Sequence, residues 1–147
     1  MKYIVIILFL MSTVMAQGQV DAKEFKAANK QFKIGNYYGA LKMYEKLYVQ
    51  DPENKELNFY MGVCNYNGKN YGKAEEHFSK SSSSTSLELF RYRASIAHIG
   101  MKFKKASNYL EQALHSNYKN HDLLYLFDPS IKKDKTIQTL IKQYKDK

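Results

Sequence analysis

Apolar residues recur every three or four positions along short segments of this chain, with polar residues between them. One such stripe consists of Leu57, Tyr60, Met61 and Cys64. This spacing places apolar side chains on one face of an α-helix, so it predicts amphipathic helices. Turns at Gly35-Asn36 and Gly68-Lys69-Asn70 separate the stripes, and Gly and Asn tolerate the positive φ that ends a helix. The pattern therefore predicts helix–turn–helix pairs.

The pairs are copies of one unit. Four positions of the first turn and second helix recur further along the chain at one constant offset, and they are Asn36/Asn70, Tyr37/Tyr71, Ala40/Ala74 and Tyr44/Phe78. A third copy contains Phe103, Ala106, Leu110 and Ala113, with Ala106 following Ala74 at a slightly shorter offset. A fixed period of roughly 34 residues is the mark of a repeat architecture. It predicts three pairs within residues 17–120, at about 21–54, 55–86 and 87–120.

Both ends of the chain differ from the repeats. Residues 1–16 combine Lys2, an apolar stretch and a small residue at Ala16, an order that predicts a secretory signal peptide cleaved after Ala16. Retention of this segment as an anchor is the alternative. Residues 121–147 are expected to form a closing segment, with a short helix over 121–127 and a second start at Asp128-Pro129. Its apolar stripe, Ile131, Ile137, Leu140 and Ile141, suits a helix that caps the open end of a stack.

The repeated residues resemble those of the tetratricopeptide repeat (TPR) family over about residues 21–120. The matching residues are Gly35, Tyr37, Ala40, Tyr44 and Pro52, then Met61, Gly62, Tyr71, Ala74 and Phe78, and the third copy given above. Arg93 stands where that family usually has leucine. The segment from Glu56 to Tyr66 is also similar to the second repeat of envelope TPR modules in Bacteroidota-type bacteria. The resemblance implies an all-α, right-handed α-solenoid with a concave groove that holds another protein.

In that family the first helix of each pair lines the groove. The residues implied to face it are Phe25, Asn29, Phe32 and Lys33 in the first pair, Phe59, Val63, Tyr66 and Asn67 in the second, and Arg91, Ser95 and His98 in the third. Exposed aromatic rings beside amides and a cation suit an extended peptide or a partner helix. Whether Phe25, Phe32 and Phe59 instead pack against neighbouring helices stays open.

The two-carboxylate clamp of chaperone-binding relatives is not expected. Only Asn29 fits that clamp, because Phe25 replaces its lysine and Glu88 would repel a C-terminal carboxylate. We therefore expect an exported scaffold that binds a different protein, in envelope assembly or secretion, located in the periplasm or secreted.

Charge suggests an alternative function. The chain carries 23 basic against 14 acidic residues, a net charge of +9, and residues 101–147 hold ten lysines against five acids. Such a lysine-rich end could bind a polyanion or a membrane surface, an interaction that salt would weaken. No nucleic-acid partner is expected in the leading interpretation, because a lysine-faced cap on a repeat stack explains the same excess.

The residues that could catalyse a reaction or bind a metal or phosphate form no recognisable site. Residues 68–74 lack the spacing and the Ser or Thr of a phosphate loop, and His77, His98, His115 and His121 lack metal-site spacing. The single cysteine, Cys64, lies on an apolar stripe, so we expect a buried, inert thiol. The sequence thus predicts no catalytic activity, no cofactor and no metal site.

Overall fold

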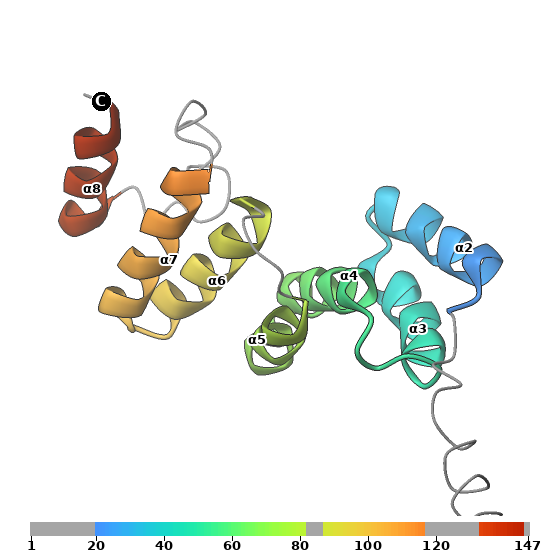
Figure 1. The fold of residues 1–147 in the computed structure, drawn as a ribbon. Helices are drawn as coiled ribbons and strands as arrows, with labels where there is room; N and C mark the ends of the chain where they lie inside the picture. The colour runs from blue at the N-terminus through green and yellow to red at the C-terminus, as the bar shows by residue number, and fades with distance from the viewer. Residues whose placement is uncertain (1–19, 82–86, 117–132, 146–147) are drawn as a thin grey trace, which may run out of the picture.

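The computed structural model describes residues 20–81, 87–116 and 133–145, and these residues form helices and turns without a strand (Figure 1). The helices are α2 (Ala22–Lys33), α3 (Tyr37–Tyr48), α4 (Lys55–Asn67), α5 (Tyr71–Lys80), α6 (Leu87–Ile99), α7 (Phe103–Ser116) and α8 (Lys135–Lys145). The prediction of an all-α fold is confirmed. The signal segment with Ala16, the serine-rich residues 82–86, and His121, Asp128-Pro129 and Ile131 of the closing segment lie outside the described residues.

Short turns join α2 to α3, α4 to α5, and α6 to α7, and each of these pairs packs along its length. The pairs follow one another across the molecule, and α8 lies against α7 at the far end (Figure 1). This is a helical-repeat solenoid with a C-terminal capping helix, as predicted. No helix in the described part of the chain is both long and apolar enough to cross a membrane.

The three turns within the pairs share one set of backbone hydrogen bonds. The N–H groups of Asn36, Asn70 and Lys102 each bond to a carbonyl five positions earlier, at 2.8–3.0 Å. The residue before each of these has a positive φ, namely Gly35 (79°), Lys69 (61°) and Met101 (57°). This is a Schellman ending. The prediction of a positive φ holds at Gly35, but in the second turn Lys69 adopts it, whereas Gly68 ends α4 with φ −76°.

The repeated small and aromatic residues form the core. Ala40, Ala74 and Ala106 are fully buried where two helices of a pair meet, and the equivalent large residues Tyr44, Phe78 and Leu110 are buried beside them. One core cluster joins α2, α3 and α4, and a second joins α4, α5 and α6. A third cluster joins α6, α7 and α8 around Ala94, Leu110, Ile137 and Ile141. Ile137 and Ile141 thus cap the stack as predicted.

The two junctions between pairs differ in how closely they pack. Helix α4 contacts α3 extensively, whereas contacts of α6 with α5 and α4 are sparser. The second junction consists of one small cluster, in which Leu89 and Tyr92 of α6 meet Val63 and Phe78, together with an ion pair between Glu75 and Arg93. The solenoid is therefore most weakly joined between its second and third pairs.

Candidate functional site

Aromatic rings connect the first helices of the three pairs. Phe25 and Phe32 of α2 lie 5.9 and 4.9 Å from the ring of Tyr60 in α4, measured between centroids. Tyr60 neighbours Phe59 at 5.8 Å, and Phe59 lies 6.4 Å from Tyr92 of α6. Tilted and edge-to-face pairs at such distances attract one another by about 0.5–1.5 kcal/mol beyond their buried area. We call Phe25, Phe32, Phe59, Tyr60, Tyr66 and Tyr92 the aromatic face.

The predicted groove residues of α2 lie at one end of this face. Phe25 and Phe32 are half-buried and Lys33 is exposed, so both interpretations of the phenylalanines hold: the rings pack and keep an accessible edge. The side-chain oxygen of Asn29 is committed to the fold, because it accepts a hydrogen bond from the hydroxyl of Tyr44 at 2.5 Å. Burial raises the pKa of Tyr44, which keeps that hydroxyl protonated and able to donate.

Helix α4 provides the centre of the face. Phe59 and Tyr66 are half-buried, and Tyr66 packs on Tyr92 of α6 at 5.0 Å. Asn67 is exposed, and its amide donates to the Val63 carbonyl of its own helix at 2.9 Å. The prediction that Val63 lines an open groove is wrong: its side chain is 2% exposed, because α6 covers it through Leu89.

Helix α6 contributes less accessible surface than predicted. Arg91 is 5% exposed and Ser95 is fully buried, so neither side chain can contact a partner in this conformation, and both predictions of accessibility are wrong. His98 is partly buried, and its Nε2 lies 3.4 Å from the Asp134 carboxylate just before α8. The same carboxylate accepts the backbone N–H groups of Thr136 and Ile137. His98 therefore lies where α6 meets the capping helix.

Sequence reasoning missed Tyr60 and Tyr92, the two rings that join the helices. Tyr60 stacks on Tyr44 at 5.7 Å, and Tyr92 stacks on Phe78 at 5.4 Å, so each joins the other rings of the face to the core. Burial raises the pKa of Tyr92 to about 12. A signal was present, because the offset between these tyrosines equals the offset between Ala74 and Ala106.

A buried polar pair holds α4 against α5 behind the face. The amide nitrogen of Asn58 donates to the carbonyls of Pro52 and Asn54 at 2.8 and 2.9 Å, so its oxygen is turned toward Nδ1 of His77 at 2.9 Å. The His77 ring also meets Tyr48 of α3 edge-on. In this arrangement Nδ1 carries a proton and donates it to the Asn58 oxygen.

This pair predicts a loss of stability in mild acid. Burial lowers the pKa of His77, with Lys80 and Lys73 acting in the same direction and Glu76 and Glu45 opposing them. The unfolded chain therefore binds a proton more readily than the folded chain, so the free energy of unfolding falls as the pH drops through about 6.5. We expect the midpoint temperature of thermal unfolding to be lower at pH 5.5 than at pH 7.5.

The same measurement on His77→Gln is expected to show a weaker dependence on pH, since that variant has no group to protonate at this position. An identical pH dependence in wild type and His77→Gln would contradict the assignment.

The remaining side chains that could react or bind a metal are buried or scattered. Among the described residues, no three His, Cys, Asp or Glu side chains gather in a way that could hold a metal ion. Cys64 is 2% exposed, and burial raises the pKa of its thiol to about 12, so the thiol stays protonated, as expected for an inert core cysteine.

Comparison with known proteins identifies the fold. No protein-family model matches the sequence, and no curated protein matches it. The second TPR domain of the human RPAP3 protein, in complex with HSP70 peptide SGPTIEEVD, is similar with a TM-score of 0.58 and 19% identity, over 84% of this chain and 93% of that one. The first TPR of Spaghetti (RPAP3), bound to HSP90 peptide SRMEEVD, is similar with a TM-score of 0.61 and 17% identity, over 86% of this chain and 94% of that one. The solenoid described here thus has the fold of tetratricopeptide-repeat domains.

Proposed function

We propose that this chain is a non-catalytic adaptor that binds an extended peptide or a helix of another protein across the aromatic face of α2 and α4. The observation that carries the proposal is the row of half-exposed rings, Phe25, Phe32, Phe59 and Tyr66, bordered by the exposed Lys33 and Asn67. Aromatic side chains with one accessible edge are the residues that most often anchor protein partners. The similar TPR domains are bound to HSP70 and HSP90 peptides, which supports a peptide-sized partner.

The chemistry of the face favours an apolar partner over an acidic C-terminus. Both peptides bound by the similar domains end in Glu-Glu-Val-Asp. Here Phe25 occupies the neighbouring position on the helix face, and because the Asn29 oxygen accepts the Tyr44 hydroxyl, only the Asn29 amide nitrogen is left to donate to a ligand. A terminal carboxylate would meet that amide and the exposed lysines Lys26, Lys30 and Lys33 at the α2 end of the face only, whereas leucine, methionine or aromatic side chains would pack on the rings of both helices. We therefore infer a partner anchored by apolar side chains.

The location proposed for this adaptor is the bacterial envelope or the exterior of the cell. The proposal rests on the segment that ends at Ala16, whose charge and apolar stretch are those of an export signal. The partner would then be another exported protein, bound during envelope assembly or secretion.

Selection from a phage-displayed random peptide library against the purified chain tests the proposed function. We expect enriched peptides that carry two or more apolar or aromatic residues. Fluorescence anisotropy should show that Phe59→Ala and Tyr66→Ala weaken their binding by roughly tenfold or more, since truncating a central interface anchor removes about 1–2 kcal/mol or more. Circular dichroism establishes that helicity is retained.

Two further variants make this result specific. Lys33→Glu changes the border of the face at an exposed position and should weaken acidic peptides more than neutral ones. Tyr38→Ala, which removes a ring 76% exposed on α3, should bind like the wild type. Peptides whose affinity falls equally in Tyr38→Ala and Phe59→Ala would reject the aromatic face as the binding site.

A further inference from the structure

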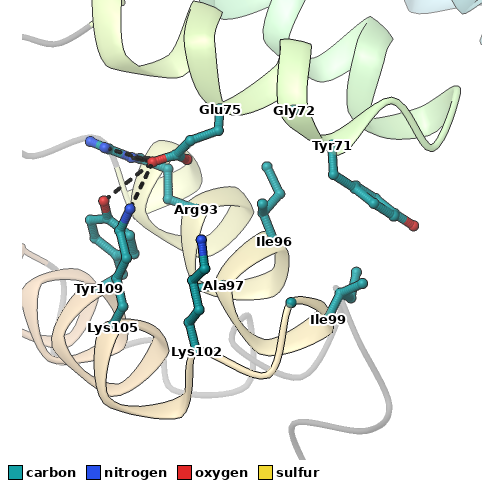
Figure 2. A pocket seen from close by; sticks show the side chains of 11 residues that line it. Tyr71, Gly72, Glu75, Arg93, Ile96, Ala97, Ile99, Lys102, Lys105 and Tyr109 are labelled. Carbon is teal, nitrogen blue, oxygen red and sulfur yellow. Dashed lines mark hydrogen bonds and ion pairs between the residues drawn. The ribbon is translucent and has the colours of Figure 1, made fainter.

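A hollow lies at the loosely packed junction between the second and third pairs. It has a volume of about 340 Å³ and is enclosed by the start of α5, the second half of α6 and the first half of α7. Figure 2 shows these elements facing one another around the open space, with Tyr71 and Ile99 on one side and Glu75, Arg93 and Tyr109 on the other. We call it the inter-pair cavity.

One carboxylate in the wall of this cavity is fully engaged. Glu75 accepts two hydrogen bonds from Nε of Arg93, at 3.2 and 3.3 Å, and one from Nη2 at 2.9 Å. Lys105 Nζ and the Tyr109 hydroxyl reach the same oxygen at 3.5 and 3.4 Å (Figure 2). The guanidinium also lies over the Tyr109 ring, 4.5 Å from its centroid. This network explains the arginine at position 93, where the family usually has leucine.

The cavity has more positive than negative charge. Arg93 and Lys105 share the single carboxylate of Glu75, and Lys102 adds a third cation. Lys102 is exposed and its side chain extends along the cavity (Figure 2). Within residues 20–81, 87–116 and 133–145, its ammonium makes no ion pair and no hydrogen bond that could neutralise it. A carboxylate placed beside Lys102 would therefore complete the charge balance.

The opposite wall is apolar, and further apolar side chains are exposed next to the cavity. Tyr71, Ile96 and Ile99 line the interior. On the side of Lys102, the turn between α6 and α7 exposes Met101 (79%) and Phe103 (50%), which line an adjoining open hollow. Exposed apolar side chains that adjoin one another mark contact surfaces for other proteins. These two side chains lie outside the volume that a small ligand in the cavity would fill, which favours a polypeptide as the occupant.

We propose that the inter-pair cavity binds an acidic segment of a partner protein, with one large apolar side chain against Tyr71, Ile96 and Ile99 and a flanking carboxylate paired with Lys102. This site goes beyond the function proposed above, because it uses α5, α6 and α7 and selects acidic residues. The aromatic face selects apolar residues and lies mainly on α2 and α4, with only Tyr92 contributed by α6.

A fluorescein-labelled peptide, Gly-Glu-Glu-Phe-Glu-Glu-Gly, is the probe, and its anisotropy is measured against the full chain. We expect saturable binding. Replacing the peptide's Phe with Gly, or its four Glu with Gln, should weaken binding roughly tenfold or more, since the first removes the apolar anchor and the second removes the charge. A probe that fails to bind, or that binds equally in all three forms, would overturn the proposal.

Two variants of the chain test whether the peptide binds in the cavity. Gly72 lines the cavity, and a Cβ added there meets no other atom within 4 Å, so Gly72→Leu starts a bulky apolar side chain in open space at the cavity wall. We expect this variant to bind the peptide at least about tenfold more weakly while its melting temperature stays at or above the wild-type value, because leucine favours the helix. Lys102→Glu should weaken binding roughly five- to tenfold.

The matched control is Lys142→Glu, which makes the same charge change at an exposed position of α8, outside the cavity and the hollow beside it. It should retain binding near the wild-type level, as should Phe59→Ala. Equal loss in Lys102→Glu and Lys142→Glu would overturn the proposal in favour of general attraction by the basic end. Loss in Phe59→Ala would move the peptide to the aromatic face and overturn it too.

Vesicles of phosphatidylglycerol and phosphatidylcholine test a membrane as the occupant. Sedimentation of the chain with these vesicles that disappears in both Lys102→Glu and Gly72→Leu would assign the cavity to a lipid surface and overturn the peptide proposal. Sedimentation that is absent, or is unchanged by Gly72→Leu, supports the peptide assignment.

Discussion

Replacing Phe78 with alanine is expected to lower the free energy of unfolding by about 3–5 kcal/mol, the cost of truncating a fully buried aromatic residue. Phe78 has no exposed surface, stacks on Tyr92 at 5.4 Å and lies 6.2 Å from Phe59. Its ring therefore supports the second pair and the junction to the third at once. Domains of this size are stable by about 5–15 kcal/mol, so the variant should unfold at a much lower urea concentration.

Two further variants test whether the loss of stability comes from lost packing. Phe78→Leu keeps most of the volume and should lose less than half as much stability. An added Cβ at Gly62 would lie only 2.5 Å from the Phe78 ring, so Gly62→Ala is expected to gain nothing or to destabilise the wild-type chain. In the Phe78→Ala background the same methyl has room and should recover about 1 kcal/mol of helix stability. Additive effects in this double-mutant cycle would contradict the observed packing.

Replacing Leu110 with alanine is expected to cost about 2–5 kcal/mol, mainly in the third pair and the capping helix. Leu110 is buried with Ala94 of α6 and with Ile137 and Ile141 of α8, in a cluster that shares no residue with the other two. Repeat proteins couple mostly through nearest neighbours, and the junction before α6 is the sparser one. The damage should therefore stay on the C-terminal side of that junction.

Native-state hydrogen exchange measures where the stability is lost. In Leu110→Ala, the amides of α7 and α8 should lose protection while those of α2 to α4 keep it. Leu47→Ala, which truncates a fully buried residue of α3, should give the opposite pattern. Equal loss throughout the chain in both variants would mean that the solenoid unfolds as a single unit.

The helix pairs could be predicted because their signals are local and repeated. Ala40, Ala74 and Ala106 are small where two helices meet, and the period that relates them also relates the buried Tyr44, Phe78 and Leu110. A single coincidence would mean little, but several at one period require the same packing each time. The residue with positive φ in each turn could be predicted less well. Lys69 and Met101 adopt this conformation although neither is glycine or asparagine, because the backbone hydrogen bonds of the turn require it.

Accessibility within the candidate site could be predicted only in part. Helical phase places Phe59, Val63 and Tyr66 on one side of α4, and the structure agrees that they lie toward α6. Phase does not say how far the next helix covers that side. Leu89 lies close enough to bury Val63, whereas Phe59 and Tyr66 keep an exposed edge.

The inter-pair cavity had no sequence signal of its own. Its walls come from three helices, and its existence depends on how far α6 lies from α5, which no spacing within one helix encodes. Arg93 was visible as a departure from the family pattern. Its partner, Glu75, could be found only from the packing of α5 against α6.

The buried cysteine makes this protein convenient for site-specific labelling. Cys64 is the only cysteine in the sequence, and its protonated, covered thiol should react slowly with maleimides while the chain is folded. A cysteine introduced at an exposed position such as Tyr38 or Val49 would then carry a dye alone, with the native residue left in place. Two such positions, one on each side of the second junction, would report by energy transfer on the angle between the helix pairs.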